Sequence, residues 1–290
     1  MFQTDLLKGK RILVTGGGTG LGRAMADRFL ELGAELFICG RRKSVLERTA
    51  DELMAARGGA GAAWPGDIRV AEAVDEMVGE IWQGGPLDGL VNNAAGNFIS
   101  RTEDLSPRGF DAIANIVLHG TFYVTHACGR RWLAEGHPAS VVSIVVTWVW
   151  TGSAYTVPSA MSKAGVAAMT QSLAVEWGGR GIRVNAIAPG PFPTKGAWDR
   201  LMPTDKLASD YTESVPMGRP GENDELANLA SFLMADQCRY INGAIIPIDG
   251  AQWLNGAGTF ARLRELSDQD WTNIRDAIKS ANAKDKALRS

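Results

Sequence analysis

The stretch Arg11–Gly22, RILVTGGGTGLG, decides the fold of this 290-residue chain. RILVT is an apolar run typical of a buried strand, and from Leu21 onward apolar side chains recur at helical spacing. Glycines at positions 16, 20 and 22 permit a tight turn, close approach of the backbone to a phosphate and close helix–strand packing. Free N–H groups and the dipole at the helix start stabilise an anion. This strand–turn–helix context favours a pyrophosphate-binding turn over a plain structural one.

Outward from this turn, short apolar runs alternate with longer segments of helical spacing. The predicted strands are Arg11–Thr15, Glu35–Cys39, Ala62–Trp64, Leu87–Asn92, Ser140–Thr147, Arg183–Ala188 and Ala244–Ile248. The helical segments after the first are Ser44–Ala56, Val70–Trp82, most of Ser106–Gly136 and Ser159–Gly178. The run Ser140–Thr147 has the apolar character of a strand buried on both faces. The alternation predicts an α/β fold, with a parallel sheet of about seven strands and helices on both faces.

The composition excludes several classes of protein. Thirty Lys and Arg against 32 Asp and Glu leave a net charge of −2, which argues against a nucleic-acid partner. The three cysteines are far apart and form no pair, and the three histidines form no ligand set, so neither a disulfide framework nor a metal site is predicted. Because no apolar run approaches the length of a membrane span and no leader is evident, we expect a cytoplasmic protein without a membrane partner.

No linker divides the chain, so a single domain over residues 1–290 is predicted, with two additions to its frame. Residues 190–221 hold five of the twelve prolines and are expected to form a mobile substrate flap. Residues 251–290 are expected to form a C-terminal extension that ends in an amphipathic helix and a charged tail.

The residues after the second predicted strand indicate whether the turn would bind NAD(H) or NADP(H). Arg41 and Arg42 stand where an acidic residue would accept hydrogen bonds from a ribose 2′-hydroxyl. Since arginine pairs with a 2′-phosphate, NADP(H) is the predicted cofactor, and two solvated surface arginines are the alternative. Asp67 is predicted to accept a hydrogen bond from the adenine amino group, or else to cap the helix near Val70. The predicted contacts from the turn are Gly16, Gly18, Thr19, Gly20 and Leu21.

At this point the chain resembles the short-chain dehydrogenase/reductase family. The matching pieces follow the family's order over about residues 9–250: Thr15–Gly22 (TGGGTGLG), Asn92–Gly96 (NNAAG), Lys163 in SAMSKAG, and Pro189-Gly190. The resemblance implies a single doubly wound domain of Rossmann type, a nicotinamide cofactor and a homotetramer. Further cofactor contacts that we assign on this resemblance are Asn93, Ala94, Lys163, Pro189, Gly190, Phe192 and Thr194.

The chain departs from the ordinary family pattern at three active-site positions. Ser159 stands where the family carries Tyr, four residues before Lys163. Val146 stands in place of the usual serine, and Val117 in place of the usual helix asparagine. Ordinary carbonyl reduction needs a phenol acid beside the lysine, which serine and valine cannot supply. The usual alcohol dehydrogenase or ketone reductase activity is therefore less well supported.

A narrower resemblance, to the 2,4-dienoyl-CoA reductases, fits better. It extends over nearly the whole chain, through Asn92–Ser100 (NNAAGNFIS), Val157–Ala160 (VPSA), Pro193–Ala197 (PTKGA), Glu225–Ala230 (ELANLA), Ile241–Ala244 (INGA) and Leu263–Ile278 (LRELSDQDWTNIRDAI). In the mitochondrial-type members of this group, an Asn and a Tyr contact the thioester carbonyl. The first maps to Asn97, and the second to Trp148, where this sequence departs from the group.

Reduction of a dienoyl thioester moves negative charge to the thioester oxygen, so donors aimed at that oxygen lower the barrier. Asn97 and the indole N–H of Trp148 are the candidate donors, but an indole cannot release a proton as a phenol can. Solvent held by Ser159 or Lys163 is therefore the predicted proton source, and Lys163 is also expected to hold the nicotinamide ribose. Alternatively, Trp148 is only an aromatic wall residue, and Tyr155 is the acid.

Two further residues are expected to meet the substrate: Phe98 on the acyl chain and Arg200 on a CoA phosphate. Ser106 is expected to be a helix N-cap. The predicted function is NADPH-dependent reduction of an unsaturated acyl-CoA thioester in fatty-acid β-oxidation. The alternatives are a short-chain oxidoreductase that acts on another acyl thioester or an enone, and a non-catalytic NADP-binding paralogue.

Overall fold

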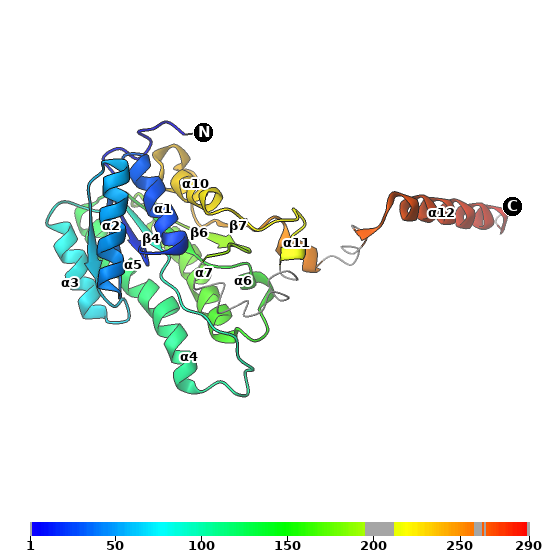
Figure 1. Cartoon of the computed structure of the whole chain (residues 1–290), viewed down its shortest axis with the longest axis horizontal. Helices are drawn as coiled ribbons and strands as arrows, with labels where there is room; N and C mark the ends of the chain where they lie inside the picture. The colour runs from blue at the N-terminus through cyan, green and yellow to red at the C-terminus, as the bar shows by residue number, and fades with distance from the viewer. Residues whose placement is uncertain (1, 195–211, 258–262, 264, 289–290) are drawn as a thin grey trace.

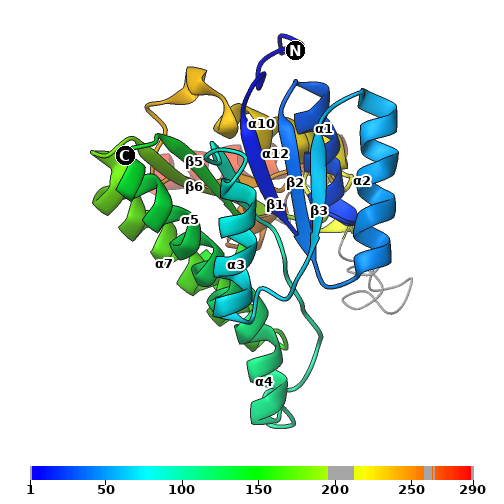
Figure 2. The same ribbon diagram turned by 90° about the vertical axis from the view of Figure 1, so that its left-hand side faces the viewer.

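A computed structural model of the chain describes residues 2–194, 212–257, 263 and 265–288, with side chains described up to residue 279. Its centre is a seven-stranded parallel sheet in the order β3-β2-β1-β4-β5-β6-β7 (Figures 1 and 2). The strands are β1 (Arg11–Thr15), β2 (Glu35–Gly40), β3 (Gly61–Pro65), β4 (Gly89–Asn92), β5 (Ala139–Ile144), β6 (Ile182–Pro189) and β7 (Ile245–Ile248). The predicted α/β fold is confirmed, since the strand order reverses between β1 and β4 as in a doubly wound sheet.

Helices cover both faces of the sheet, and each layer encloses its own apolar core (Figure 2). One layer contains α1 (Gly20–Glu31), α2 (Lys43–Arg57) and α10 (Asn223–Met234). The other contains α3 (Ala71–Trp82), α5 (Gly120–Glu135) and α7 (Val157–Gly178). The remaining helices are α4 (Pro107–Ala114), the π-helix η1 (Asn115–His119), α6 (Trp148–Thr151), the short η2 (Asp236–Cys238), α11 (Gln252–Ala257) and α12 (Asp268–Leu288). None of the described helices is long and apolar enough to cross a membrane.

One predicted strand ends earlier than expected. The strand expected to reach Thr147 ends at Ile144, after which Val145 donates one more hydrogen bond, to Ile187 O at 2.8 Å. Trp148 therefore opens a short helix and does not end a strand. The C-terminal extension contains the helix α12, which runs from Asp268 to Leu288.

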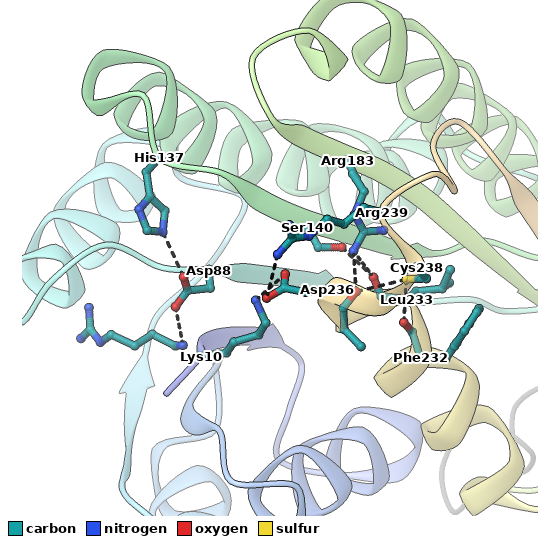
Figure 3. A network of polar contacts seen from close by, with 12 residues as sticks. Lys10, Asp88, His137, Ser140, Arg183, Phe232, Leu233, Asp236, Cys238 and Arg239 are labelled. Atoms are coloured by element: carbon teal, nitrogen blue, oxygen red, sulfur yellow. Dashed lines mark hydrogen bonds and ion pairs between the residues drawn. The ribbon is translucent and has the colours of Figure 1, made fainter. Parts of the chain in front are cut away.

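A polar network joins the amino ends of the strands (Figure 3). Asp88, just before β4, accepts a hydrogen bond from the backbone N–H of Arg11 at 2.8 Å and contacts His137 Nε2 at 3.0 Å. Ser140 and Arg183, at the starts of β5 and β6, both donate to the carbonyl of Leu233, at 2.9 and 2.7 Å. These contacts tie the strand starts to one another, to the last turn of α10 and to the loop after α5. In folds of this kind ligands bind at the opposite, carboxyl ends.

Candidate functional site

The predicted site residues gather at the carboxyl ends of the strands. The phosphate turn Thr15–Gly22 follows β1, residues 93–100 follow β4, and residues 145–156 follow β5. Residues 190–194 follow β6, and the segment from Asp249 follows β7. Because all seven strands are parallel, these segments meet at one edge, next to the point where the strand order reverses.

The phosphate turn requires glycine at three of its positions. Gly16 and Gly20 have φ angles of 66° and 55°, a region that favours glycine. A Cβ atom on Gly22 would lie 2.4 Å from the carbonyl oxygen of Gly16 and 2.5 Å from Asn93 Nδ2. Thr19, the N-cap residue of α1, makes no side-chain cap bond, and the first turn of the helix carries no acidic residue. The turn therefore fits the pyrophosphate of a dinucleotide.

The loop after β4 braces this turn. Thr15 Oγ1 accepts hydrogen bonds from the backbone N–H groups of Asn93 and Ala94, each at 3.0 Å. The Asn93 carboxamide donates in turn to the carbonyls of Thr15 and Gly16, at 3.1 and 3.3 Å. Asn93, predicted to contact the cofactor, thus has its amide hydrogens engaged in holding the turn.

The cationic residues at the end of β2 are unpaired. Arg41 and Arg42 are both exposed, and neither forms an ion pair with any residue in the described ranges. Asp67 lies near them, and its carboxylate accepts a forked pair of hydrogen bonds from Arg69 Nε and Nη2 at 2.9 and 2.5 Å. That hydrogen bonding to Arg69, with a smaller contribution from Arg41, holds the pKa of Asp67 below its usual value.

The structure decides one alternative for Asp67. The N-cap residue of α3 is Val70, which has no side-chain cap bond, and the Asp67 side chain bonds the backbone N–H of Arg69 outside the helix. The helix-cap interpretation of Asp67 was therefore wrong. Arg69 was not foreseen as its partner, although an Arg two residues after an Asp is a visible signal of such a pair.

Lys163 is almost completely buried on α7, with 8% of its surface exposed. Its ammonium group donates to the carbonyl of Ile144, the last residue of β5. Burial lowers the pKa of Lys163 to about 8. Ser159 lies one helical turn earlier, and it too is buried, with 5% of its surface exposed. The hydroxyl and the ammonium therefore share one face of α7.

The two candidate donors lie on neighbouring loops. Asn97 Oδ1 accepts a hydrogen bond from the backbone N–H of Phe98 at 2.9 Å, and Asn97 Nδ2 has no hydrogen-bond partner among the described residues. Trp148 is half-buried at the start of α6, and its indole N–H has no hydrogen-bond partner among the described residues. The loops are tied together by the N–H of Ser100, which donates to the carbonyl of Tyr155 at 2.9 Å.

Three aromatic residues near these loops differ in their packing and exposure. Phe98 packs towards α4, since a Cβ atom on Gly109 would lie 3.6 Å from its ring. Tyr155 has 59% of its surface exposed, so its phenol is not buried as Lys163 is. Phe192 has only 8% of its surface exposed and packs against Gly221 in the apolar core. Its backbone alone is therefore left for the predicted contact with the nicotinamide.

The loop after β6 lies against the segment after β7. A Cβ atom on Gly190 would lie 2.5 Å from Asp249 Cβ, so this position has no room for a side chain. Thr194 sits over the phosphate turn, where a Cβ atom on Gly20 would lie 3.4 Å from Thr194 Cβ. Arg200 lies outside the described residues, as does most of the predicted flap. The Ser106 hydroxyl accepts from Gly109 N at 3.1 Å, which confirms the predicted N-cap.

Comparison with known proteins identifies the family. A family model described as enoyl-(acyl carrier protein) reductase matches residues 16–251. The chain belongs to the short-chain dehydrogenase/reductase family. It is therefore an oxidoreductase with a site for a nicotinamide cofactor.

The relatives of this short-chain dehydrogenase/reductase include proteins named as 2,4-dienoyl-CoA reductases. One, "probable 2,4-dienoyl-CoA reductase 3" from Caenorhabditis elegans, is 44% identical over 99% of this chain and 94% of its own length. Another, from Bacillus subtilis, is 42% identical over 85% of this chain and 97% of its own length. A solved structure with bound NADP, of a candidate 2-deoxy-D-gluconate 3-dehydrogenase from Agrobacterium tumefaciens, is 32% identical. It superposes with a TM-score of 0.80 over 87% of this chain and 100% of its own.

Proposed function

We propose that the protein reduces 2,4-dienoyl-CoA thioesters with NADPH, in the β-oxidation of unsaturated fatty acids. The names of its relatives support this substrate class. The observation that carries the proposal is the Asn97 carboxamide, whose oxygen accepts from Phe98 N while Nδ2 has no hydrogen-bond partner within the described part of the chain. The ordinary phenol acid is missing at Ser159, so a mechanism that depends on oxygen stabilisation fits this site better than carbonyl protonation does.

The proposed reduction uses four side chains of the protein. NADPH, when bound, supplies a hydride to the far end of the diene, and the thioester oxygen then carries the negative charge of a dienolate. Asn97 Nδ2 and the Trp148 indole N–H are proposed to donate to that oxygen, where the loss of one donor costs about 10²- to 10³-fold in rate. A water held by Ser159 and Lys163 is proposed to deliver the proton to carbon, which completes the two-electron reduction of one double bond.

Turnover of a dienoyl thioester tests the proposal. NADPH oxidation is expected with 2,4-hexadienoyl-CoA and not with crotonyl-CoA, because only the diene delocalises the charge over an extended system. Faster turnover of crotonyl-CoA or of a simple enone would indicate a different oxidoreductase. Tight NADPH binding without turnover of any thioester would indicate a non-catalytic paralogue.

Trp148→Phe is expected to slow hydride transfer by about 100-fold, because the ring is retained and only the N–H donor is lost. Stopped-flow measurement of NADPH oxidation with bound 2,4-hexadienoyl-CoA checks this result. Trp271→Phe, on the distant α12, is the matched control and should leave the rate unchanged. An unchanged rate in Trp148→Phe would remove the indole from the mechanism.

The free arginines support NADPH as the nucleotide. Replacing both Arg41 and Arg42 by Ala is expected to raise the KM for NADPH about 10- to 100-fold, since hydrogen bonds to charged groups contribute about 1.5–3 kcal/mol. The KM for NADH should change little, because NADH has no 2′-phosphate. Arg48→Ala, on the exposed side of α2 beside Glu52, is the control. Equal losses for both nucleotides would contradict the assignment.

Contacts between Phe98 and the acyl chain, and between Arg200 and CoA, remain part of this proposal. So do the substrate flap at 190–221, the single-domain organisation, a homotetramer and a cytoplasmic location, all of which rest on the sequence.

A further inference from the structure

A stacked tryptophan pair joins the active-site edge to the C-terminal segment. The rings of Trp150 on α6 and Trp253 on α11 lie 4.8 Å apart at an interplanar angle of 29°. Figure 1 shows α6 and α11 side by side at this edge of the molecule. Trp148, the proposed donor, is the first residue of the same four-residue helix that carries Trp150.

Trp253 is anchored independently of this stack. Its backbone N–H donates to Asp249 Oδ2 at 2.8 Å, and Ala251 N donates to Oδ1 at 3.0 Å. Asp249 is buried directly after β7, in contact with Gly190. The indole of Trp253 is therefore carried by a segment that is fixed to the end of the sheet.

The rest of α11 is held by other contacts. Gln252 Nε2 donates to Ser214 Oγ at 2.7 Å, and Asn255 Nδ2 donates to the carbonyl of Ser214 at 3.0 Å. Because these bonds do not involve the Trp253 side chain, removal of that ring leaves the position of α11 defined.

The short helix α6 depends on contacts with other parts of the chain. It is a single turn of four residues whose N-cap residue, Thr147, makes no side-chain cap bond. One helical turn is not stable alone, so its orientation depends on tertiary contacts. Two described contacts hold α6 from its two sides: Val149 packs against the apolar cluster that contains Val145 and Val166, and Trp150 stacks on Trp253.

We propose that Trp253 is a positioning residue that acts through Trp150 to orient α6, so that the Trp148 indole N–H faces the thioester oxygen. This inference rests on the proposed function, in which Trp148 is a donor. It makes the C-terminal segment part of the active-site architecture, through the contact between Trp253 and Trp150.

A double-mutant cycle tests this role. The hydride-transfer rate with 2,4-hexadienoyl-CoA is measured in single turnovers for the unchanged protein, Trp253→Ala, Trp148→Phe and the double variant. Trp253→Ala is expected to slow transfer about 10-fold alone but less than about 2-fold in the Trp148→Phe background, because coupled residues are not additive. The KM for NADPH should be unchanged. Trp253→Phe should keep the rate within about 3-fold, since it retains an aromatic face.

The controls and contrary outcomes are distinct. Leu254→Ala, at an exposed neighbouring position, should leave the rate unchanged. Equal slowing by Trp253→Ala in both backgrounds, or no slowing in the native background, would overturn the positioning role alone. A native rate in Trp148→Phe would instead remove the proposed donor and the inference with it. Should Trp253→Ala fail to fold, Trp253→Leu, which keeps apolar bulk without a ring, takes its place in the cycle.

Discussion

Replacing Lys163 with methionine is expected to lower kcat/KM for 2,4-hexadienoyl-CoA by about 10³-fold, because the site loses both its cation and its means of holding a proton-delivering water. Lys163 is buried and its ammonium donates to the Ile144 carbonyl at the end of β5. Methionine keeps the length and apolar stem of the side chain. The loss should therefore reflect the missing charge and not a collapsed site.

Although its activity falls, the Lys163→Met variant should be at least as stable to heat as the unchanged protein. Burial lowers the pKa of Lys163 from 10.5 to about 8, so at pH 7 the folded protein holds a cation that its surroundings disfavour. Methionine removes that unfavourable desolvation, and the midpoint of thermal unfolding at pH 7 should stay the same or rise. Lys279→Met, on α12, is the control for loss of an exposed charge and should leave activity unchanged.

The pH dependence follows from the same pKa. As pH rises through about 8, the folded protein loses the Lys163 proton, and kcat/KM should fall in parallel. Between about pH 8 and 10.5 the unfolded chain binds the extra proton, so the contribution of this group to the free energy of unfolding rises with pH. A kcat/KM profile that stays flat from pH 7 to 9.5, or a Lys163→Met variant within tenfold of native activity, would contradict the role given to the cation.

The elements that the sequence predicted well have local signals. The turn between β1 and α1 and the helix that carries Lys163 have the structure expected, because glycine spacing and helical periodicity are visible in the sequence itself. The strand–helix alternation was equally visible, since a strand buried on both faces must be apolar throughout and an amphipathic helix must repeat at 3.6 residues.

The sequence-based predictions fail where tertiary contacts determine the end of an element or the position of a side chain. The apolar run continues unbroken from Ile144 into Val145 and Val146, so periodicity alone cannot show that β5 stops and that α6 begins at Trp148. The packing of the Phe192 ring beside Gly221 is likewise a tertiary contact that the sequence around it does not report, and it leaves the predicted contact with the nicotinamide to the backbone.

The stack of Trp150 on Trp253 joins segments that are far apart in the sequence. No local pattern in either segment reports such a contact. The two segments follow β5 and β7, which lie in one sheet. The contact is therefore visible only once the positions of these strands are known.

Gly22→Val is expected to raise the Kd for NADPH on the order of 10³-fold, because the first atom of any side chain there meets two fixed groups. A Cβ atom would lie 2.4 Å from the Gly16 carbonyl oxygen and 2.5 Å from Asn93 Nδ2. Neither can retreat cheaply, since Asn93 also bonds the Thr15 carbonyl and its own N–H bonds Thr15 Oγ1. The strain must therefore move the phosphate turn itself.

Fluorescence titration with NADPH measures this loss, and thermal unfolding separates it from misfolding. Gly22→Ala should give an intermediate loss of about 100-fold, since overpacking by a single methyl group costs up to about 3 kcal/mol. Gly179→Val is the matched control, because Gly179 has an ordinary φ of −66° and no atom within 4 Å of its Cβ position. Native NADPH affinity in Gly22→Val would mean that the turn does not hold the pyrophosphate, because a displaced turn cannot keep its N–H groups aimed at the anion.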